Sequence, residues 1–287
     1  MASNILHTIE NALPSFSKGQ KRIASFILNN FDTAAFMTAG KLGKAANVSE
    51  STVVRFATEL GFDGYPGMQK ALQEVVRLKL TSVQRIKASS TELDGQDILS
   101  SVLHKELENI RRVNSMERSS FQKAVDQLLQ ARHIYIIGVR SSSFLAGYLN
   151  FYLNKLFPNV TLVQSNVAGA IYEQLMRVGA GDILLAICFP RYSKEAVSAA
   201  KFAVARGAEV VALTDSENSP LYPLSAAALL VGNEMISFVD SMVAPMCVAN
   251  ALIVALSGKM GTDIDRTFAE LEQIWKQFGV YNELGDE

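Results

Sequence analysis

The second half of the sequence alternates between short apolar runs and helix-length amphipathic segments, and this alternation restricts the fold more than any other feature. The β-branched runs lie at 133–137, 160–163, 183–187, 209–213 and 227–231. The helical patterns lie at 143–156, 167–178, 194–206, 241–258 and 264–278. Apolar strands that alternate with helices are typical of a parallel sheet covered on both faces. The sequence therefore predicts an α/β, doubly wound domain with a five-stranded parallel sheet, whose ligands bind beyond the carboxyl ends of the strands.

The first 80 residues contain only helical patterns. An amphipathic helix that opens with Ile5 and Ile9 is expected to stop at Pro14, and Ser17 can cap the helix that follows. Shorter helices are expected at 40–46, 50–60 and 66–79. The chain therefore begins with an all-α domain.

A polar stretch at 89–95 has no hydrophobic period and is interpreted as a linker. A long amphipathic helix over 97–115 follows it. We expect three parts: a helical domain over 1–80, a linker and connecting helix over 81–118, and the α/β domain over 119–287.

The segment 42–56 has the residue types of a helix-turn-helix. Ala46 is small where two helices would cross, and Asn47 tolerates the left-handed conformation that the turn needs. Ser49 can then cap a second helix, with Thr52 three residues later. A helical hairpin without any role in DNA binding is the alternative.

The second helix of this motif is expected to enter the major groove of DNA. Its small hydroxyl residues permit a close approach, Arg55 can reach a guanine edge or a phosphate, and the amides near Ser49 suit a phosphate. The predicted DNA-binding residues are Lys44, Ser49, Glu50, Ser51, Thr52 and Arg55. A solvated Arg55 is the alternative.

Charge and composition agree with a DNA-binding head on a globular body. Residues 1–87 carry 11 Lys and Arg against 6 Asp and Glu, and the remaining residues carry 16 against 22. A basic head suits a polyanionic partner such as DNA.

The two cysteines, Cys188 and Cys247, lie in apolar surroundings, which favours a reducing compartment, so we expect a cytoplasmic protein. We expect no membrane span, because the longest apolar stretch, 242–256, is too short.

The runs from Val48 to Phe56 and from Leu60 to Pro66 strongly resemble the N-terminal domain of the RpiR (MurR/RpiR) family of bacterial regulators. The order of domains extends this resemblance over nearly the whole chain. It implies that the C-terminal part is a SIS (sugar isomerase) domain, a fold that binds phosphosugars.

The first predicted strand runs into a turn that contains Gly138, Arg140 and three serines, Ser141, Ser142 and Ser143. Hydroxyls beside a helix N-terminus favour an anion, and the serines could also be simple helix caps. The SIS pattern at this turn is G-x-G-x-S. Gly138 and Ser142 match it, whereas Arg140 replaces its second glycine.

The second SIS loop usually reads S-x-S-G-x-T-x-E, and this chain has Cys188-Phe189-Pro190-Arg191-Tyr192-Ser193-Lys194-Glu195. Proline has no amide donor, so the usual phosphate cradle is altered. Arginine binds phosphate or carboxylate in a bidentate manner, so Arg140 and Arg191 are expected to hold a sugar phosphate or a sugar acid, unless they form structural ion pairs. The predicted ligand residues of this loop and the next are Arg191, Tyr192, Ser193, Glu195 and Asp215, and Asp215 could instead form a turn. Glu234 could meet a sugar hydroxyl or lie on the surface.

These features predict a DNA-binding transcriptional regulator that is controlled by an anionic sugar derivative and is not an enzyme. The alternative is a sugar-phosphate isomerase with an accessory helical domain. The chain has three histidines, His7, His104 and His133, and none is expected at the ligand edge of the sheet. We expect no catalytic residues, metal or cofactor. A homodimer or homotetramer is expected, with contacts through helices 97–115 and 241–258.

Overall fold

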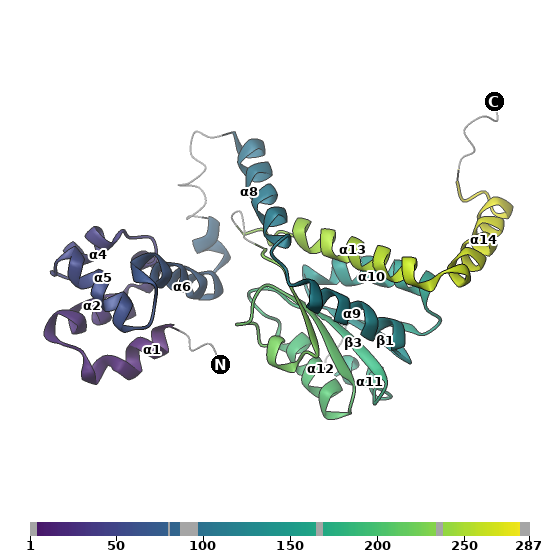
Figure 1. Cartoon of the computed structure of the whole chain (residues 1–287), viewed down its shortest axis with the longest axis horizontal. Helices are drawn as coiled ribbons and strands as arrows, with labels where there is room; N and C mark the ends of the chain where they lie inside the picture. The colour runs from purple at the N-terminus through teal and green to yellow at the C-terminus, as the bar shows by residue number, and fades with distance from the viewer. Residues whose placement is uncertain (1–4, 80, 87–96, 165–168, 234–237, 282–287) are drawn as a thin grey trace. The chain divides into compact units, whose positions relative to one another are not determined.

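The structure, a computed structural model, describes residues 5–79, 81–86, 97–164, 169–233 and 238–281. The chain divides into two compact units, Met1–Glu92 and Leu93–Glu287. Figure 1 shows the elements of each unit. The predicted linker over 89–95 lies outside the described residues.

The first unit is all helical, as predicted. Its elements are α1 (Ile5–Ala12), a 3-10 turn (Leu13–Ser15), α2 (Lys18–Asn29), α3 (Phe31–Ala34), α4 (Ala39–Ala45), α5 (Glu50–Glu59) and α6 (Gly64–Lys79). Side chains from helices α1 to α6 form one apolar core, in which Phe56, Ile23, Leu42 and Leu72 are fully buried. This core fixes the orientation of the short helices α4 and α5, because helices of this length are not stable alone.

Polar contacts hold the ends of these helices. Ser17 caps α2, as predicted, and forms a reciprocal capping box with Gln20. The hydroxyl of Tyr65 donates to the carbonyl of Met37 at 2.6 Å, and the Gln69 amide donates to the same carbonyl at 2.8 Å. Burial of Tyr65 raises its pKa to about 12, so this hydroxyl remains a donor at any physiological pH.

The second unit is an α/β domain with a five-stranded sheet of order β2-β1-β3-β4-β5, in which every neighbouring pair is parallel. The strands are β1 (His133–Gly138), β2 (Val160–Val163), β3 (Asp182–Ile187), β4 (Glu209–Thr214) and β5 (Ala227–Leu230). The helices are α8 (Ile98–Val113), α9 (Arg118–Gln130), α10 (Ser142–Leu156), α11 (Ala170–Gln174), α12 (Lys194–Ala205), α13 (Val243–Met260) and α14 (Thr262–Gln277). The predicted doubly wound sheet is confirmed.

One predicted helix is shorter than expected. The pattern indicated a helix over 167–178, but α11 ends at Gln174. The chain then turns so that Leu175 and Val178 are buried against the sheet. The Arg206 guanidinium donates to the carbonyls of Met176 and Val178, which therefore need no helical partner.

The sheet is the middle of three layers (Figure 1). Helices α9, α10 and α13 cover one face, and α11 and α12 cover the other. Helix α13 is long and apolar enough to cross a membrane by length and composition alone. Its residues Ala244, Val248 and Leu252 are buried in the core of this domain, and a core helix has the same composition.

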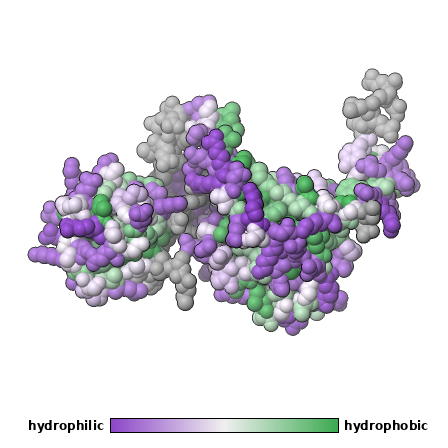
Figure 2. All heavy atoms as spheres, viewed as in Figure 1, coloured by the Kyte–Doolittle hydropathy of each residue, from purple (hydrophilic) through white to green (hydrophobic). Residues whose placement is uncertain are grey.

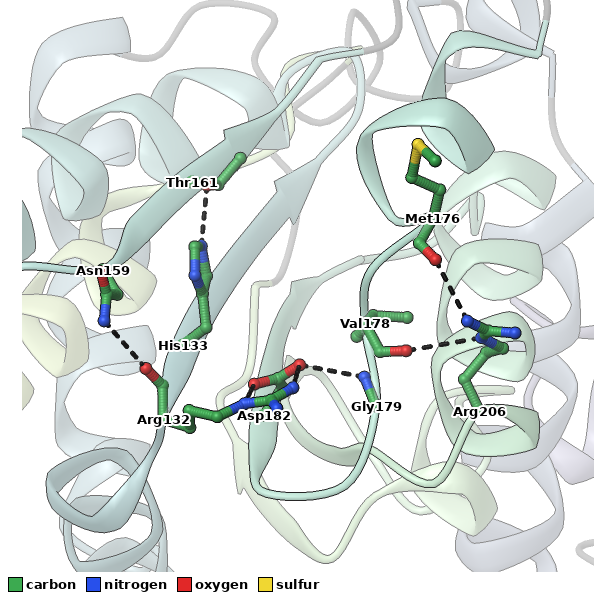
Figure 3. A network of polar contacts seen from close by, with 9 residues as sticks. All are labelled: Arg132, His133, Asn159, Thr161, Met176, Val178, Gly179, Asp182 and Arg206. Carbon is green, nitrogen blue, oxygen red and sulfur yellow. Dashed lines mark hydrogen bonds and ion pairs between the residues drawn. The ribbon is translucent and has the colours of Figure 1, made fainter.

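A polar network closes the amino end of the sheet (Figure 3). Asp182, at the start of β3, accepts two hydrogen bonds of 2.8 Å from the Arg132 guanidinium and one of 2.9 Å from the amide of Gly179. Burial acts to raise the pKa of Asp182, but these hydrogen bonds and the charge of Arg132 outweigh burial and hold the pKa below its usual value. His133 lies in this network, donating to or accepting from the Thr161 hydroxyl at 2.8 Å. It therefore lies at the opposite end of the sheet from the predicted ligand site.

We expect Asp182→Asn to lower the free energy of unfolding by about 2 kcal/mol at neutral pH, because a buried carboxylate loses charged hydrogen bonds. Urea denaturation measures this change. The matched control is Asp126→Asn, which removes an exposed ion pair with Lys259 and should lower the free energy of unfolding much less than Asp182→Asn does.

The cost of Asp182→Asn should depend on pH. Because the folded pKa of Asp182 is below the ordinary value of 3.8, its carboxylate stabilises the fold above that pH, and this stabilisation is lost as the pH falls through the folded pKa. The difference between wild type and variant should therefore shrink in acid. A difference that stays constant down to the acid transition would contradict the role of the charge.

Candidate functional site

The helix-turn-helix predicted at 42–56 is formed by α4 and α5. Asn47 adopts a left-handed conformation with φ of 54°, as the sequence indicated. The amide of Val48 donates to the carbonyl of Gly43 at 2.8 Å, which closes the turn. A Cβ atom at Gly43 would lie 3.0 Å from the carbonyl oxygen of Val48. The closest approach therefore falls on Gly43, while Ala46, predicted for this role, caps α4 and is buried.

Ser49 caps α5 through its hydroxyl, which accepts a hydrogen bond from the amide of Thr52 at 3.3 Å. The same hydroxyl lies 2.9 Å from that of Ser51 and 2.8 Å from that of Thr52. Thr52, predicted to point outward, is half-buried, with its methyl group close to Gly19 of α2. Glu50 is exposed, and its carboxylate lies beside Gly40 of α4.

An exposed stripe runs along α5. Ser51, Val54, Arg55 and Thr58 recur at helical spacing and are all exposed, and Lys44 on α4 is exposed as well. Among the described residues, neither the Arg55 side chain nor the Lys44 side chain has a hydrogen-bond or ion-pair partner. This stripe is free to contact a nucleic acid.

The second predicted site lies where the parallel strands end. Gly138 of β1 is in register with Ile187 of β3, and Ile187 is in register with Leu213 of β4. The loops that follow these strands therefore leave the same edge of the sheet, as predicted.

The turn after β1 depends on Gly138. A Cβ atom at this position would lie 2.4 Å from the carbonyl oxygen of Ser142 in the first turn of α10. No side chain fits there, so the strand and the first turn of the helix approach each other directly.

Arg140 occupies this turn with φ of 59°, a left-handed conformation that favours glycine. Its side chain is exposed and makes no hydrogen bond or ion pair with the part of the chain that the structure describes. Arg140 therefore keeps the backbone of the glycine that the family pattern has here, at some cost in free energy, and offers a free guanidinium.

The three serines of this turn have different surroundings. The Ser143 hydroxyl donates to the carbonyl of Arg140 at 2.6 Å, and the Ser141 hydroxyl donates to Asp240 at 3.1 Å. Ser142 is 4% exposed, and its hydroxyl makes no hydrogen bond to any described residue. A hydroxyl without a partner at the start of a helix is suited to an anion.

The loop after β3 is held mainly by structural contacts. Cys188 accepts a hydrogen bond at its Sγ from the amide of Ser193 at 3.2 Å, and Ser193 caps α12. Burial raises the pKa of the Cys188 thiol to about 11, so it is not a thiolate nucleophile at neutral pH. Arg191 and Glu195 are exposed at this edge.

Tyr192 joins this loop to the next one. Its hydroxyl donates to Asp215 at 2.8 Å. The pKa of Tyr192 is raised, mainly by burial and in addition by the negative charge of Asp215. Asp215 also accepts from the Ser216 hydroxyl at 3.2 Å. These contacts tie the loop after β3 to the loop after β4, a role that differs from the turn considered for Asp215 from the sequence.

Sequence reasoning missed several residues. Val54 and Thr58 complete the exposed stripe on α5, and their spacing of three and seven residues from Ser51 could have indicated them. Asp240 meets Ser141 across 99 positions of sequence, for which no local pattern exists. Glu234 lies outside the described residues.

Comparisons with known proteins match the two compact units to two different domain families. A helix-turn-helix domain model of the rpiR family matches residues 3–77, and a SIS domain model matches residues 127–255. The Vibrio vulnificus NanR protein, solved in complex with ManNAc-6P, is 23% identical with a TM-score of 0.59, covering 96% of this chain and 99% of its own.

Two further solved structures resemble the second unit. The sugar isomerase domain of an RpiR transcription factor from Sphaerobacter thermophilus is 22% identical with a TM-score of 0.59, covering 62% of this chain and 99% of its own. A protein from E. coli CFT073, solved as a ligand complex, is 19% identical with a TM-score of 0.50, covering 58% of this chain and 94% of its own. At these identities the likeness shows the fold.

The two domain models fall in order on the two compact units and together account for most of the chain. The chain therefore belongs to the RpiR family of transcriptional regulators, with an rpiR-type helix-turn-helix domain followed by a SIS domain.

Proposed function

We propose that α5 reads an operator in the major groove and that an anionic sugar derivative, bound at the carboxyl edge of the sheet, controls this binding. The observation that carries the DNA half is the exposed stripe of α5 with the unpartnered Arg55. Ser51 and Thr58 permit a close approach, Val54 can contact a thymine methyl group, and Arg55 can donate to a guanine edge. Lys44, Ser49 and Glu50 flank this stripe, with Lys44 suited to a phosphate.

The observation that carries the effector half is the backbone of Arg140. A left-handed arginine costs about 1 kcal/mol relative to glycine, and such strain persists where function requires the side chain. Together with the unpartnered Ser142 hydroxyl and the amides of α10, Arg140 would bind a phosphate or carboxylate, and Arg191 would add a second guanidinium. The complex of NanR with ManNAc-6P supports this ligand class for a protein of the same fold.

Binding without catalysis is part of the same proposal. An aldose–ketose isomerase needs a base near a substrate carbon and often a histidine. His133 lies at the amino end of the sheet, and His104 on α8 pairs with Glu108 at 3.5 Å. His7 lies on α1 of the first unit. An isomerase assay with sugar phosphates tests the alternative function.

We also propose that the chain acts as a homo-oligomer. Helices α10 and α13 are joined by a hydrogen bond of 2.6 Å from Tyr148 to Asn250. Beside it the apolar side chains of Phe144, Phe151 and Val254 are 81%, 59% and 69% exposed. Figure 2 shows apolar residues at the surface along these helices. Exposed apolar surface of this kind favours an interface, and sedimentation of Val254→Glu against wild type tests it.

The proposed compartment is the cytoplasm, where DNA is available and thiols remain reduced. Cys188 is buried, Cys247 is exposed, and both are free thiols.

Arg55→Ala should weaken operator binding by about 1–3 kcal/mol, because a bidentate contact to guanine is lost. Gel shifts with the region upstream of the protein's own gene measure this at constant salt. The matched control is Arg118→Ala on α9, which removes an exposed arginine of the second unit and should leave operator affinity unchanged. Equal affinity of Arg55→Ala and wild type for the operator would refute the assignment of α5.

Arg140→Gly should weaken anion binding while leaving the fold intact. Glycine is at ease at a φ of 59°, so the free energy of unfolding should stay the same or rise by up to about 1 kcal/mol. A thermal-shift screen over sugar phosphates and sugar acids identifies the best ligand, and calorimetry compares its affinity for the two proteins. Unchanged affinity in Arg140→Gly would show that the guanidinium does not bind the effector.

A further inference from the structure

The Ser141 hydroxyl links the anion turn to a distant segment of the chain. It donates to the carboxylate of Asp240 at 3.1 Å, and Asp240 lies in the segment that precedes α13. A hydroxyl has one proton to donate. If Ser141 donates to a bound anion, it cannot also donate to Asp240.

The residue after Asp240 is tied to α8. The hydroxyl of Ser241, which is 5% exposed, donates to the carboxylate of Glu106 at 2.6 Å. Asn109 is fully buried, and its side-chain amide donates to the same Glu106 oxygen, Oε2, at 3.4 Å. These polar groups lie where α8 packs against α13, so a displacement of Ser241 must be accommodated by α8.

Helix α8 has a special place in the chain. The second compact unit begins at Leu93, and α8 begins at Ile98, with Asp97 as its N-cap. The covalent connection from the DNA-binding unit therefore enters the SIS unit through α8. The C-terminal end of α8 is held by Ile110 and Val113, which pack on the apolar core between the sheet and helices α9, α10 and α13.

We propose that the contacts from Ser141 to Asp240 and from Ser241 to Glu106 form the switch through which an anion in the β1 turn is detected by α8. This inference rests on the proposed anion site. Without the anion, Ser141 holds Asp240, and Glu106 holds Ser241 against α8. With the anion, Ser141 donates to the anion, and the Asp240 carboxylate is left without that donor and is repelled by the new negative charge. The segment 238–241 then shifts and loosens the hydrogen bonds of Glu106.

This scheme gives the two states different affinities for the anion, as any ligand-driven change requires. In this scheme the Asp240 carboxylate competes with the anion for the hydrogen bond from the Ser141 hydroxyl. A residue that merely supports the turn would favour anion binding, whereas a competitor opposes it. The sign of one measurement therefore separates the two roles.

The test uses the full-length protein with inorganic phosphate as the probe, followed by calorimetry and by hydrogen–deuterium exchange. In the wild type, phosphate should speed amide exchange within 98–113 by about fivefold, the effect of losing about one hydrogen bond. Asp240→Ala should bind phosphate about fivefold more tightly, because a nearby like charge is removed. Its α8 should exchange rapidly without phosphate and respond no further.

Two more variants make the result independent of folding defects. Asp240→Asn preserves the shape of the side chain and should bind phosphate more tightly than wild type, with a smaller gain than Asp240→Ala. Glu108→Gln is the matched control, since Glu108 lies on the same helix and pairs with the exposed His104. It should retain both the wild-type affinity and the response of α8.

The outcomes distinguish this inference from the proposed function. Weaker phosphate binding in both Asp240 variants, or wild-type α8 exchange that ignores bound phosphate, would overturn the switch and leave the anion site standing. If calorimetry detects no phosphate binding to the wild type and the sugar anions of the thermal-shift screen also fail to bind, the anion site itself is overturned.

Discussion

The direct contact between Gly138 and the first turn of α10 is the constraint on which the ligand edge of the SIS unit depends. A single added carbon would lie 2.4 Å from the Ser142 carbonyl, so only glycine lets strand and helix meet there. That approach places the first turn of α10, with the buried residue Ser142, beside the end of β1. The parallel register of β1, β3 and β4 then brings the remaining loops to the same edge.

The two functional turns of the chain share one design. In each, a glycine permits a close approach and a non-glycine residue near it adopts a left-handed conformation: Gly43 with Asn47, and Gly138 with Arg140. Asparagine tolerates this conformation, so Asn47 is explained by the turn alone. Arginine does not, so the conformation of Arg140 needs a further explanation, which the proposed anion site would provide. Backbone conformation thus distinguishes a structural residue from a proposed ligand residue.

The sequence predicted the layered sheet, the strand positions and the helix-turn-helix, because these depend on hydrophobic period and on local cap and turn residues. Contacts between distant segments were beyond it. The ties from Tyr192 to Asp215, from Ser141 to Asp240 and from Ser241 to Glu106 span 23, 99 and 135 positions. The assignment of Ala46 to the helix crossing also shows this limit, because two small residues compete for that role and only the packing selects Gly43.

The central claim is that binding of the anion to the SIS domain changes the affinity of the helix-turn-helix domain for its operator. Thermodynamic linkage between the two binding events tests this claim most directly. Operator affinity would be measured with and without the best sugar anion of the screen, and anion affinity would be measured with and without operator. The account predicts that both affinities change by the same factor, as reciprocity demands, and that the factor exceeds about fivefold. Operator and anion affinities that are each unaffected by the other ligand would contradict it.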